Sequence, residues 1–182
     1  MRKNQNNEME DFMETCLHSA KQELNETGQV AVVTFIRPSE NGDFSKQFSH
    51  KSNGKKPMAT MPYSASSGGK DDWYQMIGMF VQRFGAEFSV MVAESWYSEN
   101  PEMDDEGIPK YTPSEDPNRK ECIVIMAVKY DTSGLITDQL TVMQPFERKG
   151  KEITYLEEKR MGGDGVEGRS RLADVTARQD LV

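Results

Sequence analysis

Four carboxylates lie near the expected ends of two strands, and they are the side chains of this sequence best placed to do chemistry. Glu94 and Glu99 lie at the end of the first expected strand, and Asp116 and Glu121 lie just before or at the start of the second. If the strands pair, these groups can converge on a divalent cation, because Mg²⁺ and Ca²⁺ prefer oxygen ligands. One hypothesis is therefore a metal-dependent hydrolase or nuclease that uses Glu94, Asp116 and Glu121.

Other catalytic constellations find little support. The two histidines are His18 and His50, and the cysteines Cys16 and Cys122 lie outside any C-x-x-C spacing, which disfavours Ser-His, Cys-His and zinc sites. The glycines of residues 163–168 match the spelling of a dinucleotide loop, but only 14 residues follow, too few for a strand–helix–strand unit. We therefore expect no cofactor and no resident metal.

Glu94 also has a structural interpretation. Residues 87–97 alternate as a strand does, and Glu94 is in phase with the apolar Phe88, Val90, Val92 and Trp96. A carboxylate on that face must be paired, neutralised or hydrated, because an isolated buried charge costs several kcal/mol. We favour an ion pair over catalysis, with a partner expected among three bases: Arg119, Lys120 and Arg37.

The elements that must position these residues follow from hydrophobic periodicity. Apolar residues at helical spacing predict helices over 8–25 and 71–84. Apolar or alternating runs predict strands over 29–37, 87–97, 121–130, 136–144 and 152–158, and a further edge strand is expected to begin at 44–47. The sequence predicts an α+β fold with a four to five stranded, mostly antiparallel sheet packed by two helices. Because a helix links the first two strands, a parallel pair and a mixed α/β fold stay open.

The length of 182 residues fits a single domain with polar ends. We expect a disordered N-terminus over 1–7, one domain over 8–160 with mobile loops at 45–70 and 98–118, and a flexible tail over 161–182. No apolar run reaches membrane-spanning length and no signal peptide is evident, so we expect a cytoplasmic protein.

The two expected loops carry opposite charge. Residues 37–70 contain six basic and two acidic residues, whereas 98–118 contain seven acidic residues and one lysine. The net charge of −8 disfavours broad nucleic-acid binding through phosphate contacts. Loops on a rigid scaffold are where recognition usually occurs. The expected binding residues are Lys51, Lys55, Lys56, Glu94, Trp96 and Arg119.

Part of the chain is similar to known sequences. Ala93-Glu-Ser-Trp96, the acidic proline-rich loop, the run 113–121 and the strand ending at Asp131-Thr-Ser-Gly134 together resemble uncharacterised small proteins of bacteria, phages and mobile elements. The resemblance covers about residues 72–158. It implies a genetic setting and supplies no catalytic residues.

The leading hypothesis is a non-enzymatic binding or accessory protein, a mobile-element or phage factor acting on a host protein. The metal-dependent hydrolase and a structural homo-oligomer are the alternatives. The sequence favours another protein as partner and indicates neither a membrane nor a nucleic-acid partner.

Overall fold

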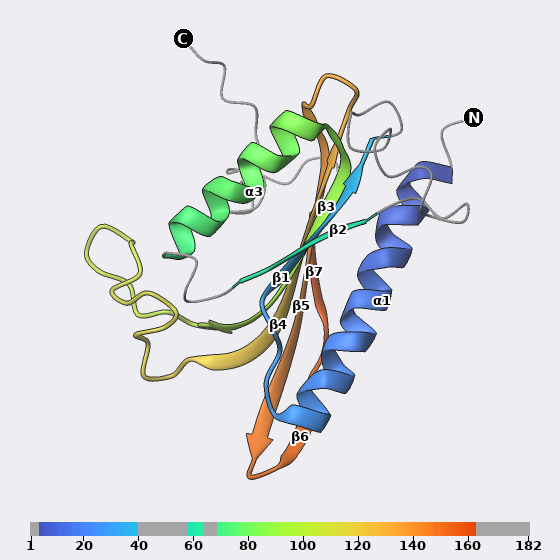
Figure 1. The fold of residues 1–182 in the computed structure, drawn as a ribbon. Helices are drawn as coiled ribbons and strands as arrows, with labels where there is room; N and C mark the ends of the chain where they lie inside the picture. The colour runs from blue at the N-terminus through green and yellow to red at the C-terminus, as the bar shows by residue number, and fades with distance from the viewer. Residues whose placement is uncertain (1–3, 40–57, 64–68, 163–182) are drawn as a thin grey trace.

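The computed structural model describes residues 4–39, 58–63 and 69–162 of the chain. Within these residues, helices and strands follow in the order α1, β1, β2, α3, β3, β4, β5, β6 and β7. Figure 1 shows one twisted sheet with α1 and α3 on opposite sides. The fold is α+β, as predicted.

The helices α1 (Asn4–Thr27) and α3 (Lys70–Phe84) form where the apolar periodicity predicts them. The apolar stripe of α1 is buried against the sheet and consists of Met9, Met13, Cys16, Leu17, Ala20 and Leu24. Gly28 ends this helix with a φ of 79°, and its N–H donates to the Leu24 carbonyl at 2.9 Å. On α3 the buried side chains are Trp73, Ile77 and Val81, and the Asp72 carboxylate accepts the N–H of Gly69 at the N-terminus.

The sheet has seven strands, more than the four to five that were predicted. They are β1 (Val33–Pro38), β2 (Ala59–Pro62), β3 (Ala86–Tyr97), β4 (Lys120–Tyr130), β5 (Ile136–Lys149), β6 (Glu152–Tyr155) and β7 (Lys159–Gly162). The order is β2-β1-β3-β4-β5-β6, and β7 pairs with β5 beside β6. Every pairing is antiparallel.

Several boundaries differ from the prediction. The parallel pair is wrong, because β1 and β3 run antiparallel with Val33 opposite Val92. The predicted loop 45–70 contains β2, and the predicted tail begins inside β7. Both are four-residue edge strands, too short for a clear periodicity. The edge strand expected at 44–47 lies outside the described residues.

The two faces of β3 support two separate layers of core. Phe88, Val90 and Val92 pack with α1, whereas Met91 packs with Trp73 and Ile77 of α3. Antiparallel register places odd-numbered residues of β4 and even-numbered residues of β5 on the same face as Val92. This parity decides which side chains meet Glu94.

Candidate functional site

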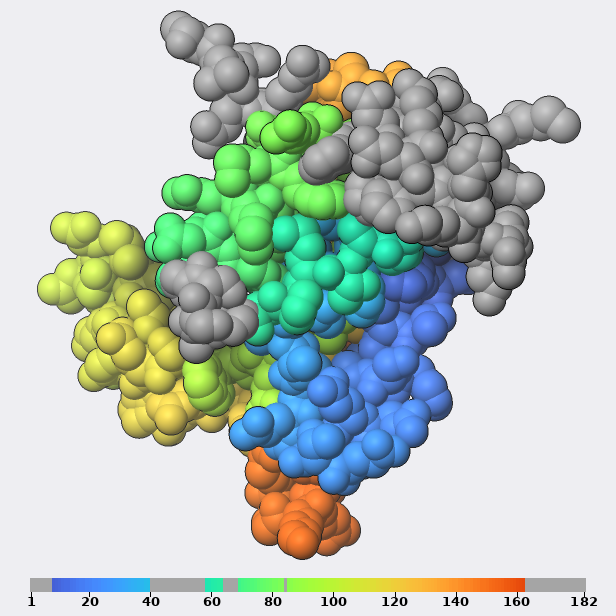
Figure 2. Space-filling view, viewed as in Figure 1, coloured from blue at the N-terminus to red at the C-terminus, as the bar shows by residue number. Residues whose placement is uncertain are grey.

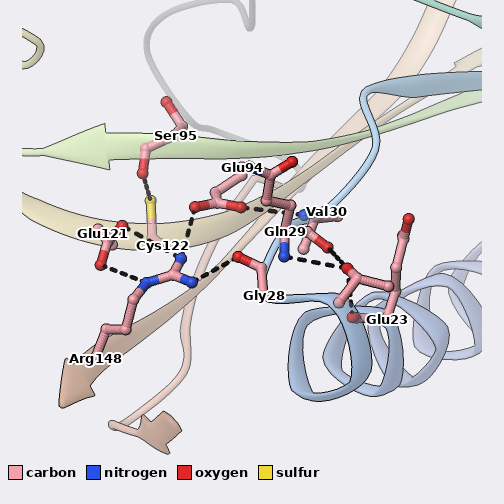
Figure 3. A network of polar contacts seen from close by, with 10 residues as sticks. Glu23, Gly28, Gln29, Val30, Glu94, Ser95, Glu121, Cys122 and Arg148 are labelled. Carbon is pink, nitrogen blue, oxygen red and sulfur yellow. Dashed lines mark hydrogen bonds and ion pairs between the residues drawn. The ribbon is translucent and has the colours of Figure 1, made fainter. Parts of the chain in front are cut away.

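Glu94 lies on the face of the sheet that α1 covers, where the strand pattern placed it. Its Oε1 accepts a hydrogen bond from Arg148 Nη2 at 3.0 Å, and its Oε2 accepts the backbone N–H of Val30 at 3.1 Å (Figure 3). The side chain is 25% exposed. Both oxygens of the carboxylate are therefore paired. Through Val30, Glu94 attaches the segment that connects α1 with β1 to strand β3.

Arg148 is the centre of this network. Its guanidinium contacts both oxygens of Glu121 at 3.4 Å, and its Nη1 donates to the Gly28 carbonyl at 2.5 Å. The guanidinium also lies 5.4 Å from the ring centroid of Phe146 on the same strand. Five donors in a planar fork allow one arginine to bind two carboxylates and a carbonyl at once. We call Glu94, Glu121, Arg148, Gly28 and Val30 the arginine clasp.

The arginine clasp follows from register. Trp96 is opposite Glu121, which is opposite Phe146, so Glu94, Glu121 and Arg148 all project from one face near one end of three adjacent strands. The carbonyl of Gly28 lies just beyond the C-terminal end of α1, where carbonyls lack intrahelical donors. A cation at this end also interacts favourably with the helix dipole.

The three predicted partners of Glu94 form other contacts. Lys120 pairs with Glu99 at 2.6 Å, and its position in β4 has the opposite parity to Glu121. Arg37 pairs with Glu8 at 2.6 Å, and it lies opposite Phe88, six residues before Glu94 on β3. Arg148 was missed because it lies between the strands predicted over 136–144 and 152–158, whereas β5 continues to Lys149.

Arg119, the third predicted partner, lies over Trp96 instead. Its guanidinium carbon is 5.5 Å from the indole centroid, and its Nη1 donates to the Ser114 carbonyl at 3.1 Å. Trp96 is 47% exposed. These two predicted binding residues therefore form an exposed cation–π pair at the end of β3.

The carboxylates proposed for a metal do not gather around one point. Glu94 and Glu121 share Arg148, but Asp116 is buried in a turn, where its Oδ1 accepts the N–H of Asn118 at 2.7 Å. Across residues 4–39, 58–63 and 69–162, no three side chains of His, Cys, Asp or Glu are grouped so that they could hold a metal ion. The arginine clasp supplies two carboxylates that already share one guanidinium.

The cysteines are buried and free. Burial raises the pKa of the Cys16 thiol to about 12, and burial together with the charge of Glu94 raises the pKa of Cys122 to about 12. A thiol with such a pKa contains very little thiolate at neutral pH, and the thiolate is the reactive form. Both cysteines serve as small apolar core residues.

Residues 98–118, which we call the acidic hairpin, extend beyond the sheet and past the N-terminal end of α3 (Figures 1 and 2). Met103 and Pro109 form an isolated antiparallel bridge, and the Lys110 N–H donates to the Glu102 carbonyl at 2.8 Å. At the tip, Asp104 Oδ1 accepts the N–H groups of Glu106 and Ile108, both at 2.9 Å. The tip is thus held by its own hydrogen bonds.

Apolar side chains are exposed along this part of the chain. Among the described residues, eight large hydrophobic side chains are exposed, and four of them lie between positions 96 and 111. These four are Trp96, Met103, Ile108 and Tyr111. The sequence analysis singled out Trp96 alone, because residues 98–118 were assessed by charge and proline content. Lys51, Lys55 and Lys56 of the predicted basic loop lie outside the described residues.

No helix among the described residues is long and apolar enough to cross a membrane. Comparisons of the chain with protein families, with curated proteins and with solved structures found no match.

Proposed function

We propose that this chain is a non-enzymatic protein-binding factor that contacts its partner through the acidic hairpin and Trp96. The observation that supports this most is the exposure of Met103, Ile108 and Tyr111 on a hairpin held by backbone hydrogen bonds. Exposed apolar groups on an ordered projection add little to the stability of the domain, and they are available to bury against a second protein.

The charge of the hairpin indicates the kind of partner. Lys110 is its only lysine and pairs with Glu102, so the exposed side chains of Asp105 and Glu106 at the tip have no lysine of the hairpin beside them as a partner. Such a surface attracts a basic partner, accelerates its association and discriminates against acidic proteins. We propose, as the sequence led us to expect, a factor of a phage or mobile element, and a host protein is therefore the first partner to test.

The arginine clasp supports the same proposal from another direction. Glu94 is the first of the carboxylates considered for catalysis. Both of its oxygens accept hydrogen bonds, one from Arg148 and one from Val30. Its contacts tie α1 to the sheet, which is a structural role. We therefore assign recognition to the hairpin rather than to Glu94.

The test is quantitative affinity purification from the native host with the wild-type chain and with the double variant Met103→Ala/Ile108→Ala. The proposal predicts a partner that the wild type retains and the double variant loses. Met79→Ala is the matched control, because Met79 is an exposed methionine on the outer side of α3, and this variant should retain the partner. Equal retention by all three proteins would refute the proposal.

A further inference from the structure

A small pocket lies between the N-terminal half of α3 and the face of the sheet that α3 covers. It has a volume of about 120 Å³, and its walls include Tyr63, Trp73, Tyr74, Ala93, Val124 and Met126. The Trp73 ring lies 5.6 Å from the centroid of Tyr63 and 5.3 Å from that of Tyr74, so three aromatic rings form one side. The side chains of Met91 and Ala93 line it on the opposite face of β3 from the Glu94 carboxylate, and Glu94 itself borders the pocket.

The size of the pocket limits what can occupy it. Pockets for drug-sized ligands and cofactors are typically about 300–1,000 Å³. A pocket of about 120 Å³ is too small for such a molecule and suits a single side chain. Aliphatic and aromatic side chains form one part of its wall, beside Lys70, Glu94 and Ser95, and an apolar side chain would bury its surface against that part.

The acidic hairpin begins close to this pocket. Ser95 lines the pocket, and the hairpin starts three residues later, just after β3 ends, at a distance of roughly 10 Å for extended chain. Lys120 and Lys159 share the carboxylate of Glu99 at the start of the hairpin, so this group of three side chains carries a net positive charge. Lys70 lines the pocket and is the basic residue that an incoming cation would meet there. Residues 98–118 contain seven acidic residues, of which Glu99 and Glu102 pair with lysines.

We propose that the pocket holds one apolar side chain of a partner peptide whose neighbouring residues are lysine or arginine and lie against the acidic hairpin. This inference rests on the proposed function and specifies the partner segment: an apolar anchor flanked by basic residues. Interfaces obtain most of their binding energy from a few buried anchors, and complementary charge fixes the orientation.

The test is isothermal titration calorimetry of the wild-type chain with three seven-residue peptides. The first has a central leucine flanked by three lysine or arginine residues on each side, the second has alanine at the centre, and the third has glutamate flanks around leucine. We expect saturable binding of the first peptide, binding about tenfold or more weaker for the alanine peptide, and none for the glutamate peptide. Equal binding of the leucine and alanine peptides, or no binding of any peptide, would overturn the inference.

Two variants locate the binding. Ala93→Leu fills the pocket and should abolish binding of the leucine peptide, whereas the control Ala31→Leu, at an exposed position, should leave it unchanged. If Ala93→Leu fails to fold, Val124→Ala enlarges the pocket instead and should shift the preference from a leucine to a phenylalanine peptide. A host partner that the Met103→Ala/Ile108→Ala variant loses but the Ala93→Leu variant retains would refute the pocket while leaving the proposed function intact.

Discussion

The arginine clasp and the acidic hairpin use the same kind of side chain in opposite ways. In the clasp, Glu94 and Glu121 are 25% and 32% exposed and share one guanidinium. In the hairpin, Glu102 is 61% exposed and pairs with Lys110, and the acidic tip lies beyond the sheet. Strand register therefore decides the role of a carboxylate in this chain. Where strand parity brings a cation to the carboxylate, it holds the fold; where the chain leaves the sheet, it is available to a partner.

We expect the largest loss of stability when the central arginine of the arginine clasp is removed. Arg148→Ala leaves Glu94, Glu121 and the Gly28 carbonyl without their common donor, and we expect a loss of about 2 kcal/mol in the free energy of unfolding. Urea unfolding followed by circular dichroism measures it. Arg119→Ala is the matched control, because that guanidinium lies over an exposed Trp96, and it should cost less than about 1 kcal/mol. Equal losses for the two variants would show that the clasp is not special.

A double-mutant cycle sharpens the comparison by isolating one contact. Glu94→Gln and Arg148→Met, separately and together, should give a coupling free energy of about 1 kcal/mol, because the two groups are in direct contact at 3.0 Å. The same cycle on the exposed pair of Glu102 and Lys110 should give about 0.5 kcal/mol or less. If the coupling free energy of the hairpin pair is as large as that of the clasp pair, burial does not strengthen the ion pair in the clasp.

Asp131, an exposed carboxylate in the turn between β4 and β5, tests how such a group contributes to the stability of the fold. Hydrogen bonds from the Ser133 hydroxyl and from the backbone N–H groups of Leu135 and Ser133 hold the pKa of Asp131 below its ordinary value of 3.8. A lowered pKa means that Asp131 stabilises the folded state fully above its ordinary pKa and that this contribution is lost as the pH falls through the folded pKa.

Asp131→Asn should therefore lower the melting temperature at neutral pH and narrow its gap to the wild type as the pH falls from about 5 to about 2. Thermal unfolding at a series of pH values measures the gap. Thr132→Ala, a neighbouring substitution in the same turn, serves as the control. A gap that stays constant over this range would contradict the assigned role of Asp131.

The smallest effect on stability is expected in the hairpin. Met103→Ala/Ile108→Ala removes side chains that are 50% and 55% exposed, so the free energy of unfolding should change by less than about 0.5 kcal/mol. Urea unfolding of the double variant tests this expectation. A loss above about 2 kcal/mol would mean that these side chains support the fold, and the proposal that they are reserved for a partner would fail.

The sequence predicted the long elements well because their periodicity is local. The stripe from Met9 to Leu24 and the alternation from Phe88 to Trp96 each identify a face without knowledge of the neighbouring strand. The phase of Glu94 was readable for the same reason. β2 and β7 were not predictable, because four residues carry little periodic signal and both depend on the strand beside them.

The partner of Glu94 could not be predicted from the sequence. Arg148 lies 54 residues away, and its proximity depends on two successive antiparallel registers and on how far β5 continues before Gly150. Arg119 and Lys120 were favoured because they are close to the strand end in sequence. The hydrogen bonds at the tip of the hairpin were also not predicted, since the carboxylate of Asp104 accepts backbone N–H groups, and charge and proline content carry no information on such contacts.

The central claim is that Glu94 holds the fold and the acidic hairpin recognises the partner. The most direct test is the dissociation constant of the host partner for Glu94→Gln, measured by calorimetry at a temperature at which circular dichroism shows the variant to be folded. We predict a value within about twofold of the wild type, because Glu94 is engaged by Arg148 and Val30 rather than by the partner. A loss of tenfold or more in the folded variant, which is about 1.4 kcal/mol, would contradict the account.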